Sequence, residues 1–113
     1  MNPAESGSVD LHVQYIACVN NAGFVMSFQT RRQRDGRNAG DSGNYPINQS
    51  RRIDLSELEF DGDRLEVGEL VQPRVHAVLG STREGPMVRY APNGQTATFN
   101  VRGTTLHYSV ELA

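Results

Sequence analysis

The sequence predicts an all-β protein, an antiparallel two-sheet β-sandwich of about eight short strands. Apolar and polar residues alternate with a period of two in most segments, and clusters of Gly, Pro, Asn and Asp separate these segments at nearly regular spacing. No segment carries a convincing helical period. Short alternating strands divided by turn residues are typical of a sandwich whose loops gather at its two ends.

The length and composition predict one domain. The chain has 113 residues, of which 37% are hydrophobic and 21% charged, enough for a core of its own. Residues 1–8 are small and polar, and we expect a flexible leader there, followed by a single β-sandwich domain over residues 9–113. The leader lacks the basic start and apolar stretch of a signal peptide. The alternatives are a cytoplasmic location, release by a non-standard route, or a signal outside this sequence.

The first predicted strands form a hairpin. Residues 20–23 form its turn, because Asn and Gly tolerate positive φ angles. Phe24, Met26 and Phe28 share the core-facing side of the second strand. Alternation along the first strand places one apolar set on a single face, and Ile16 and Cys18 on the other face allow the end of the strand to be covered on both sides. The first set is Leu11, Val13, Tyr15, Ala17 and Val19.

An Arg-rich segment follows at residues 31–44, and it predicts a long exposed loop or a strand end with a tight Asp-Gly turn. It contains three glycines, and its arginines could hold a phosphate, a sulfate or a carboxylate. The simpler alternative is a solvated hairpin tip, because most charge runs lie on the surface. The candidate ligand-binding residues are Arg31, Arg32, Arg34 and Arg37.

The remaining strands follow at similar spacing. We expect a short strand at 52–55, then one helical turn or an irregular crossing to the opposite sheet at 56–60, and a turn at 61–63. Further strands are expected at 65–71, 74–79, 87–90, 96–102 and 106–112. Pro73 is expected to end the strand at 65–71, and Gly103 forms the corner between the last two. The predicted core consists of Phe24, Met26, Phe28, Leu65, Val67, Val75, Ala77, Phe99 and Val101.

Residue types that carry catalysis or bind metals form no recognisable pattern. His12, His76 and His107 lie on three separate strands, and no nucleophile or phosphate-loop motif is present. Cys18 lies within an apolar strand, where a buried inert thiol is expected. We therefore expect no enzyme activity, no cofactor and no metal. A net charge of −2 and a pI near 5.9 argue against general nucleic-acid binding and against simple electrostatic adsorption on anionic lipid.

The end of the chain resembles the C-terminal membrane-binding β-sandwich domain of the cholesterol-dependent (thiol-activated) cytolysins. The block Asn-Val-Arg-Gly-Thr-Thr-Leu at residues 100–106, followed by Ser109, is similar to that domain's final strand and loop. Residues 22–28 and 47–55 are similar to its early aromatic strand and its Arg-rich middle strand. The resemblance implies that Thr105 and Leu106 recognise a sterol at the tip of the sandwich.

The chain also departs from that family. It has no Trp, so the family's Trp-rich, Cys-containing loop has no counterpart, and the pore-forming segments are absent from this sequence. The resemblance therefore implies a stand-alone recognition module that makes no pore.

Two non-catalytic functions follow, with a third interpretation of the corner. The domain binds a membrane surface or a sterol through Thr105 and Leu106, or it is a soluble glycan- or protein-binding module that uses the loop at 31–44. In the third, the corner is purely structural and Leu106 belongs to the core. Burial of one Leu yields only about 2 kcal/mol, so membrane binding would need avidity, for example in a homo-oligomer.

Overall fold

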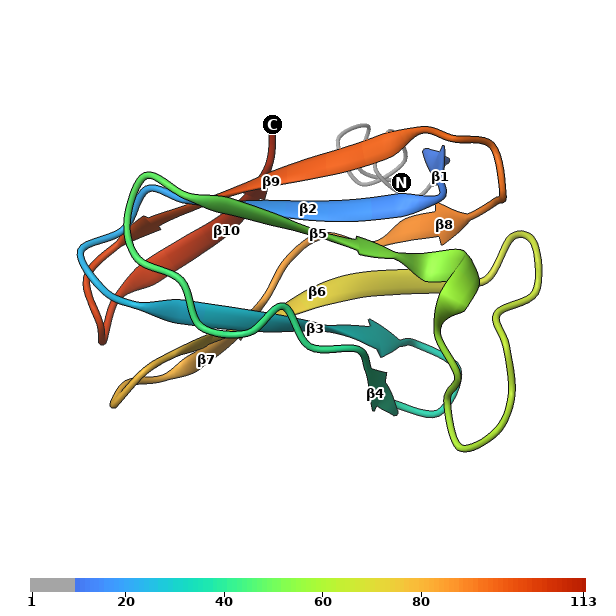
Figure 1. The fold of residues 1–113 in the computed structure, drawn as a ribbon, viewed down its shortest axis with the longest axis horizontal. Helices are drawn as coiled ribbons and strands as arrows, with labels where there is room; N and C mark the ends of the chain where they lie inside the picture. The colour runs from blue at the N-terminus through green and yellow to red at the C-terminus, as the bar shows by residue number, and fades with distance from the viewer. Residues whose placement is uncertain (1–9) are drawn as a thin grey trace.

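The computed structural model describes residues 10–113, so the leader expected at residues 1–8 lies outside the described part. Two β-sheets face each other in a sandwich (Figure 1), which confirms the all-β prediction. The only helical element among these residues is the 3-10 turn η1 (Leu55–Glu57). The strands are β1 (His12–Val13), β2 (Tyr15–Asn20), β3 (Met26–Arg32), β4 (Asn38–Ala39), β5 (Ser50–Asp54), β6 (Leu70–Ala77), β7 (Thr82–Glu84), β8 (Val88–Tyr90), β9 (Thr96–Gly103) and β10 (Tyr108–Leu112).

Both sheets are mixed, whereas the sequence predicted purely antiparallel ones. One sheet has the order β1-β8-β6-β3-β4, with β7 also paired to β6, and the other has the order β10-β9-β2-β5. β1 pairs parallel to β8, and β2 pairs parallel to β9. Alternation along a strand shows which face is buried, but it does not show which strands are neighbours. The pairing of β9 with β2 joins segments about 80 residues apart.

The first predicted strand divides at Gln14 into β1 and β2, which belong to different sheets. Val13 is buried in one sheet, whereas Ile16 and Cys18 are buried in the other. Because the break shifts the alternation by one residue, Tyr15, Ala17 and Val19 lie on the half-buried face of β2, opposite Ile16 and Cys18. The apolar set predicted as one face is thus divided after Val13.

β6 continues through Pro73, where the sequence predicted the end of a strand. The N–H of Gly85 donates to the Pro73 carbonyl oxygen at 2.9 Å, which extends the β6–β7 ladder by one residue. A regular ladder would return a bond from residue 73 to the Gly85 carbonyl, and proline has no N–H to give. The buried Gln72 side chain donates to that carbonyl instead, from Nε2 at 2.8 Å. Gln72 thus replaces the missing donor.

The core lies between the two sheets. Leu65 is buried, although it lies in the loop before β6. The other predicted core residues that are buried are Met26, Phe28, Val75, Ala77, Phe99 and Val101. Val67, predicted as core, is 68% exposed because residues 65–69 form no strand. Phe24 is only partly buried. No helix within residues 10–113 is long and apolar enough to cross a membrane.

The strand directions bring four loops to one end of the sandwich. β2 and β9 run in parallel, β6 runs antiparallel to β3, and β5 runs antiparallel to β2. The connections β2–β3, β6–β7 and β9–β10, together with the approach to β5, therefore lie side by side at the left of Figure 1. We call the loops 20–25, 44–49, 78–81 and 103–107 the tip. The loops 33–37 and 55–69 lie at the far end.

Replacing Phe99 tests the core. Phe99→Ala should lower the free energy of unfolding by about 3 to 5 kcal/mol, because its ring is fully buried between the sheets. Val67→Ala should change that free energy by less than about 0.5 kcal/mol, because its side chain faces solvent. Urea denaturation measures both, and equal losses in the two variants would contradict this core.

Candidate functional site

Backbone hydrogen bonds join the four tip loops into one unit. The Asn48 N–H donates to the Asn20 carbonyl at 2.7 Å, and the Val78 N–H donates to the Val25 carbonyl at 2.9 Å. Gly23 N–H donates to the carbonyl of Gly103 at 3.1 Å. Each loop is thus held by a neighbour from a distant part of the chain.

A buried asparagine organises the base of the tip. The Asn20 side chain is fully buried, and its Nδ2 donates to the carbonyls of Phe24 at 2.8 Å and Tyr45 at 3.2 Å. Its Oδ1 accepts from the Ala22 N–H at 2.9 Å. A buried amide is tolerated when its donors and acceptor are all satisfied. Asn20 therefore fixes the turn between β2 and β3 against the approach to β5.

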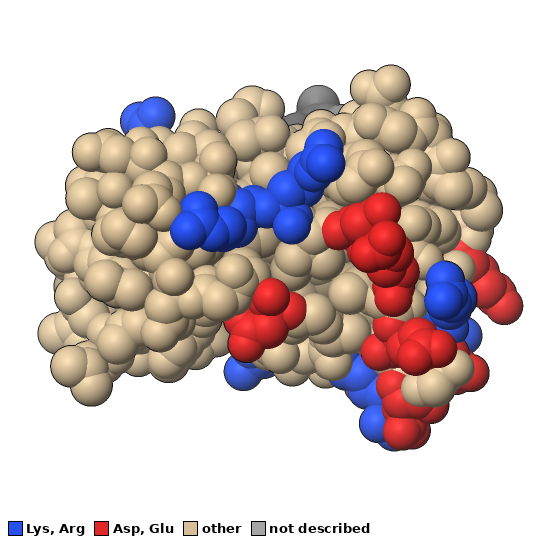
Figure 2. Space-filling view, in the orientation of Figure 1, with Lys and Arg blue, Asp and Glu red and all other residues tan. Residues whose placement is uncertain are grey.

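The tip carries no Asp, Glu, Lys or Arg, and its surface combines protruding aliphatic side chains with uncharged polar ones such as Asn48 and Thr104. Figure 2 shows the acidic side chains away from this end of the molecule. Four of the six large exposed hydrophobic residues described by the structure lie in these loops: Val25 (40% exposed), Ile47 (47%), Leu79 (96%) and Leu106 (66%). An uncharged end with protruding aliphatic groups is typical of an interaction surface.

The corner that contains Thr105 and Leu106 is a tight turn. The Thr104 N–H donates to the His107 carbonyl at 2.9 Å, and the His107 N–H returns a bond at 3.1 Å. Gly103 has a φ of 129°, and an added Cβ would lie 2.4 Å from the His107 oxygen, so only glycine fits. Leu106 therefore projects into solvent, and its assignment to the core is wrong.

The Thr105 side chain is half-buried beside Leu106. Its methyl group faces Gly80, and its hydroxyl makes no hydrogen bond to any residue in the described range. The Thr105 carbonyl lies 3.4 Å from the Ser81 N–H and 3.3 Å from the Ser81 hydroxyl. The structure thus brings Thr105 and Leu106 together in an exposed end loop. A sterol-binding role for them stays a prediction.

Leu79 is a tip residue that the sequence interpretation missed, because it was assigned to a strand. It lies in the β6–β7 hairpin with a φ of 60°, which is unusual for a leucine. The adjacent Gly80 was the available signal for a turn. The Tyr108 hydroxyl lies 2.7 Å from the Ser81 carbonyl and 3.1 Å from the Val75 carbonyl, and so holds this hairpin from below.

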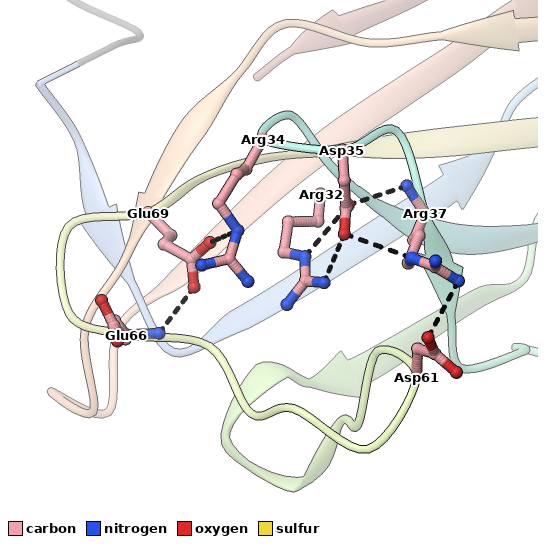
Figure 3. Close-up of polar contacts among 7 residues, drawn as sticks. All are labelled: Arg32, Arg34, Asp35, Arg37, Asp61, Glu66 and Glu69. Atoms are coloured by element: carbon pink, nitrogen blue, oxygen red, sulfur yellow. Dashed lines mark hydrogen bonds and ion pairs between the residues drawn. The ribbon is translucent and has the colours of Figure 1, made fainter.

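The arginines at 31–37 lie away from the tip and face carboxylates. Arg31 lies 3.7 Å from Glu84 and also donates to Gln72. The others belong to a charged network at the far end (Figure 3), in which Arg34 lies 3.6 Å from Glu69 and Arg37 lies 3.3 Å from both Asp35 and Asp61. Figure 3 labels Arg32, Arg34, Asp35, Arg37, Asp61, Glu66 and Glu69.

Arg32 is the buried member of this network. Its guanidinium donates to Asp35 from Nε at 3.1 Å and from Nη2 at 2.5 Å, and it lies over the Phe60 ring at 4.9 Å. Its side chain is almost completely buried. The paired carboxylate and the aromatic face compensate the buried charge. The structure thus gives Arg32 a clear role in folding, and an anion-binding role for the four arginines stays a prediction.

Two other features bear on the chemistry of the domain. A groove of about 320 Å³ lies on the outer face of β3 and β6. The Cys18 thiol is buried and forms no disulfide, and its burial raises its pKa. Within residues 10–113 no three His, Cys, Asp or Glu side chains are placed to hold a metal. The groove is lined by Ser27, Phe28, Gln29, Asp41, Arg74, His76 and Thr82.

Comparison with known proteins finds similarity at the level of fold. No protein-family model and no curated protein matches the sequence. Among solved structures, the chain is similar to pneumolysin, with a TM-score of 0.46 and 12% identity over 88% of this chain and 23% of that one. It is similar to a disulfide-locked mutant of intermedilysin with human CD59, with a TM-score of 0.46 and 15% identity over the same shares.

Both proteins are cholesterol-dependent cytolysins, the family that the sequence motifs resemble. This chain spans less than a quarter of the length of each. At these identities the likeness concerns the fold alone.

Gly80 tests the packing of the tip. A Cβ at this position would lie 2.3 Å from the Thr105 Cγ2 and 2.8 Å from the Thr105 oxygen. Gly80→Ala should therefore separate the two loops and lower the free energy of unfolding by about 1 to 3 kcal/mol. Gly23→Ala is the control, because the nearest atom to its added Cβ is 3.9 Å away. Chemical denaturation and amide shifts at residues 103–107 measure both, and an undisturbed Gly80→Ala protein would disprove this contact.

Acid should weaken the far-end network. The hydrogen bond from Arg32, together with the Arg37 N–H and both arginine charges, holds the pKa of Asp35 well below its usual value. A carboxylate with a lowered folded-state pKa contributes stability that is present above its ordinary pKa and is lost as the pH falls. The free energy of unfolding should therefore decline below about pH 4, and less steeply in Asp35→Asn.

Denaturant unfolding across the acidic range measures the two slopes. Part of the slope should persist in Asp35→Asn, because the pKa of Asp54 is also lowered. Burial raises that pKa, but hydrogen bonds from Ser56 and Gln14 outweigh the effect. Identical slopes in the wild type and the variant would rule out the Asp35 contribution.

Proposed function

We propose that this domain is a non-catalytic recognition module that binds membrane surfaces through its tip, with Thr105 and Leu106 as the sterol-recognition pair. The observation that carries the proposal is the tip itself, four interlocked loops without a charged residue that expose Leu79 and Leu106. Apolar side chains on an uncharged protrusion can enter a bilayer without the cost of dehydrating a charge.

The chemistry of the corner supports a sterol as the lipid. A sterol combines a large apolar ring system with a single hydroxyl group. Leu106 offers an exposed aliphatic surface, and the adjacent Thr105 hydroxyl is free of hydrogen bonds to described residues. One apolar contact and one hydrogen bond at neighbouring positions match this ligand.

The magnitudes predict weak binding by a single copy. Burying the side chains of Leu79 and Leu106 yields about 4 kcal/mol in total, which corresponds to a dissociation constant on the order of 1 mM. Partial burial of Val25 and Ile47 adds to this value. Useful affinity therefore depends on several tips that act together, in a homo-oligomer or on a clustered carrier.

Replacing both residues of the pair tests this function. The variant Thr105→Gly/Leu106→Ala should lose sedimentation with phosphatidylcholine–cholesterol vesicles, because losing the Leu106 contact alone weakens binding by about 30-fold. The domain should stay folded with a slightly lower melting temperature, because Leu106 lies outside the core and Thr105 is only half-buried against Gly80. The proteins are presented on a multivalent carrier so that weak binding is detected.

The matched control is Val67→Ala, which removes an exposed aliphatic group at the far end and should leave vesicle binding unchanged. Vesicles without cholesterol separate sterol recognition from general insertion. If the clustered wild type ignores cholesterol vesicles, the membrane function is wrong and a soluble glycan or protein partner takes its place. If it binds equally with and without cholesterol, only the sterol assignment fails.

A further inference from the structure

A shallow basic hollow lies beside the apolar tip. It has a volume of about 440 Å³ and is lined by Arg83, Arg102, His107, Tyr108 and Ser109. Arg102 and Ser109 face each other across the β9–β10 pair, and Arg83 comes from β7 of the other sheet. The hollow therefore joins the two sheets directly behind the turn that carries Leu106.

The arginines of this hollow form no ion pair with a carboxylate in the part of the chain that the structure describes. The ion pairs among residues 10–113 involve Arg31, Arg32, Arg34, Arg37 and Arg74, and none includes Arg83 or Arg102. The two positive charges in the hollow are therefore not neutralised within the described structure. This distinguishes the basic hollow from the far-end network, where each arginine faces an acid.

Contacts with the tip position the Arg83 guanidinium. Its Nη2 lies 3.4 Å from the Leu106 carbonyl, its Nη1 donates to the Thr82 carbonyl at 3.1 Å, and its Cζ lies 5.8 Å from the centre of the Tyr108 ring. These contacts occupy only part of its five N–H donors. The remaining donors are available to a ligand, and the Ser109 hydroxyl and the His107 ring can add to them.

The order of groups along the molecule matches the order of layers in a bilayer. The charge-free loops form the extreme end, and Arg102 and Arg83 lie in the strands just behind them. If Leu106 enters the acyl region, the basic hollow reaches the depth of the phosphates, which arginine binds with paired N–H groups. Charge and depth therefore both identify a lipid phosphate as the ligand.

We propose that Arg83, Arg102 and His107 form a binding site for the phosphate of a lipid headgroup, next to the apolar tip. The site rests on the membrane function proposed above and deepens it. Hydrophobic contacts of Leu79 and Leu106 would provide insertion, and the basic hollow would add a preference for anionic lipids. The site also sets how deeply the tip enters, because the phosphate layer stops the arginines.

The test compares two charge-matched variants on vesicles of phosphatidylcholine, cholesterol and phosphatidylserine. Arg83→Gln/Arg102→Gln should bind about 30-fold more weakly than the wild type, at about fivefold for each arginine near an anionic surface. Arg52→Gln/Arg64→Gln removes the same charge away from the hollow and should bind like the wild type. Added salt should weaken the wild type more than the double variant at the hollow. Unchanged melting curves would confirm that both variants are folded.

A second arm uses inorganic phosphate and needs no membrane. Saturable amide shifts at residues 102, 107 and 109 of the wild type, absent from the Arg83→Gln/Arg102→Gln variant, would support the site. If the wild type binds vesicles and that variant binds equally well, the phosphate site is wrong and the membrane function stands. If the wild type binds inorganic phosphate but no vesicle of any composition, the ligand is not a lipid, and the proposed membrane function is wrong as well.

Discussion

The parallel pairing of β2 with β9 is the constraint on which the rest of the structure depends. Six residue pairs, from Tyr15 opposite Thr96 to Asn20 opposite Val101, align the two strands. Because they run in the same direction, the turn after β9 must lie beside the turn after β2, and the hydrogen bond from Gly23 to Gly103 joins them. An antiparallel neighbour in this position would place Leu106 at the far end. The apolar tip is therefore a consequence of strand direction.

The two ends of the sandwich are stabilised by different physical means. The tip is stabilised by the buried Asn20 amide, by close packing at Gly80 and Gly103, and by backbone hydrogen bonds. No ion pair among the described residues involves the tip loops. At the far end, Arg32 is buried against Phe60 and Asp35, and further ion pairs surround it. A loop fixed by close backbone contact has little freedom left to lose when it binds a partner. The tip is thus fixed by close backbone contacts, whereas the far end is fixed by paired charges.

The sequence predicted the fold class, most of the core and the corner at Gly103, because each depends on local alternation or on glycine. It left open whether Leu106 is exposed or belongs to the core. It could not predict the break at Gln14, where one strand divides between two sheets, or the parallel neighbours, which depend on pairings distant in the chain. The strand end predicted at Pro73 was wrong, because the side chain of Gln72 replaces the missing backbone N–H donor. Glu69 and Asp61, which pair with Arg34 and Arg37, lie in distant segments, so the sequence pattern did not show these pairs. The hollow at Arg83 and Arg102 likewise forms only when β7 meets β9 and β10. Leu79 was missed because the apolar alternation of β6 runs on into its turn.

The unequal charge of the two ends also gives the molecule a direction in an electric field. Residues 33–37 and 55–69 contain seven carboxylates and three arginines, whereas the tip loops contain none of either (Figure 2). Near a negatively charged surface, a rigid body of this kind experiences a torque that turns its acidic end outward. Rotation then precedes collision, so that the tip leads in a larger share of encounters. The far-end carboxylates would therefore set the orientation of approach to such a surface without ever touching it.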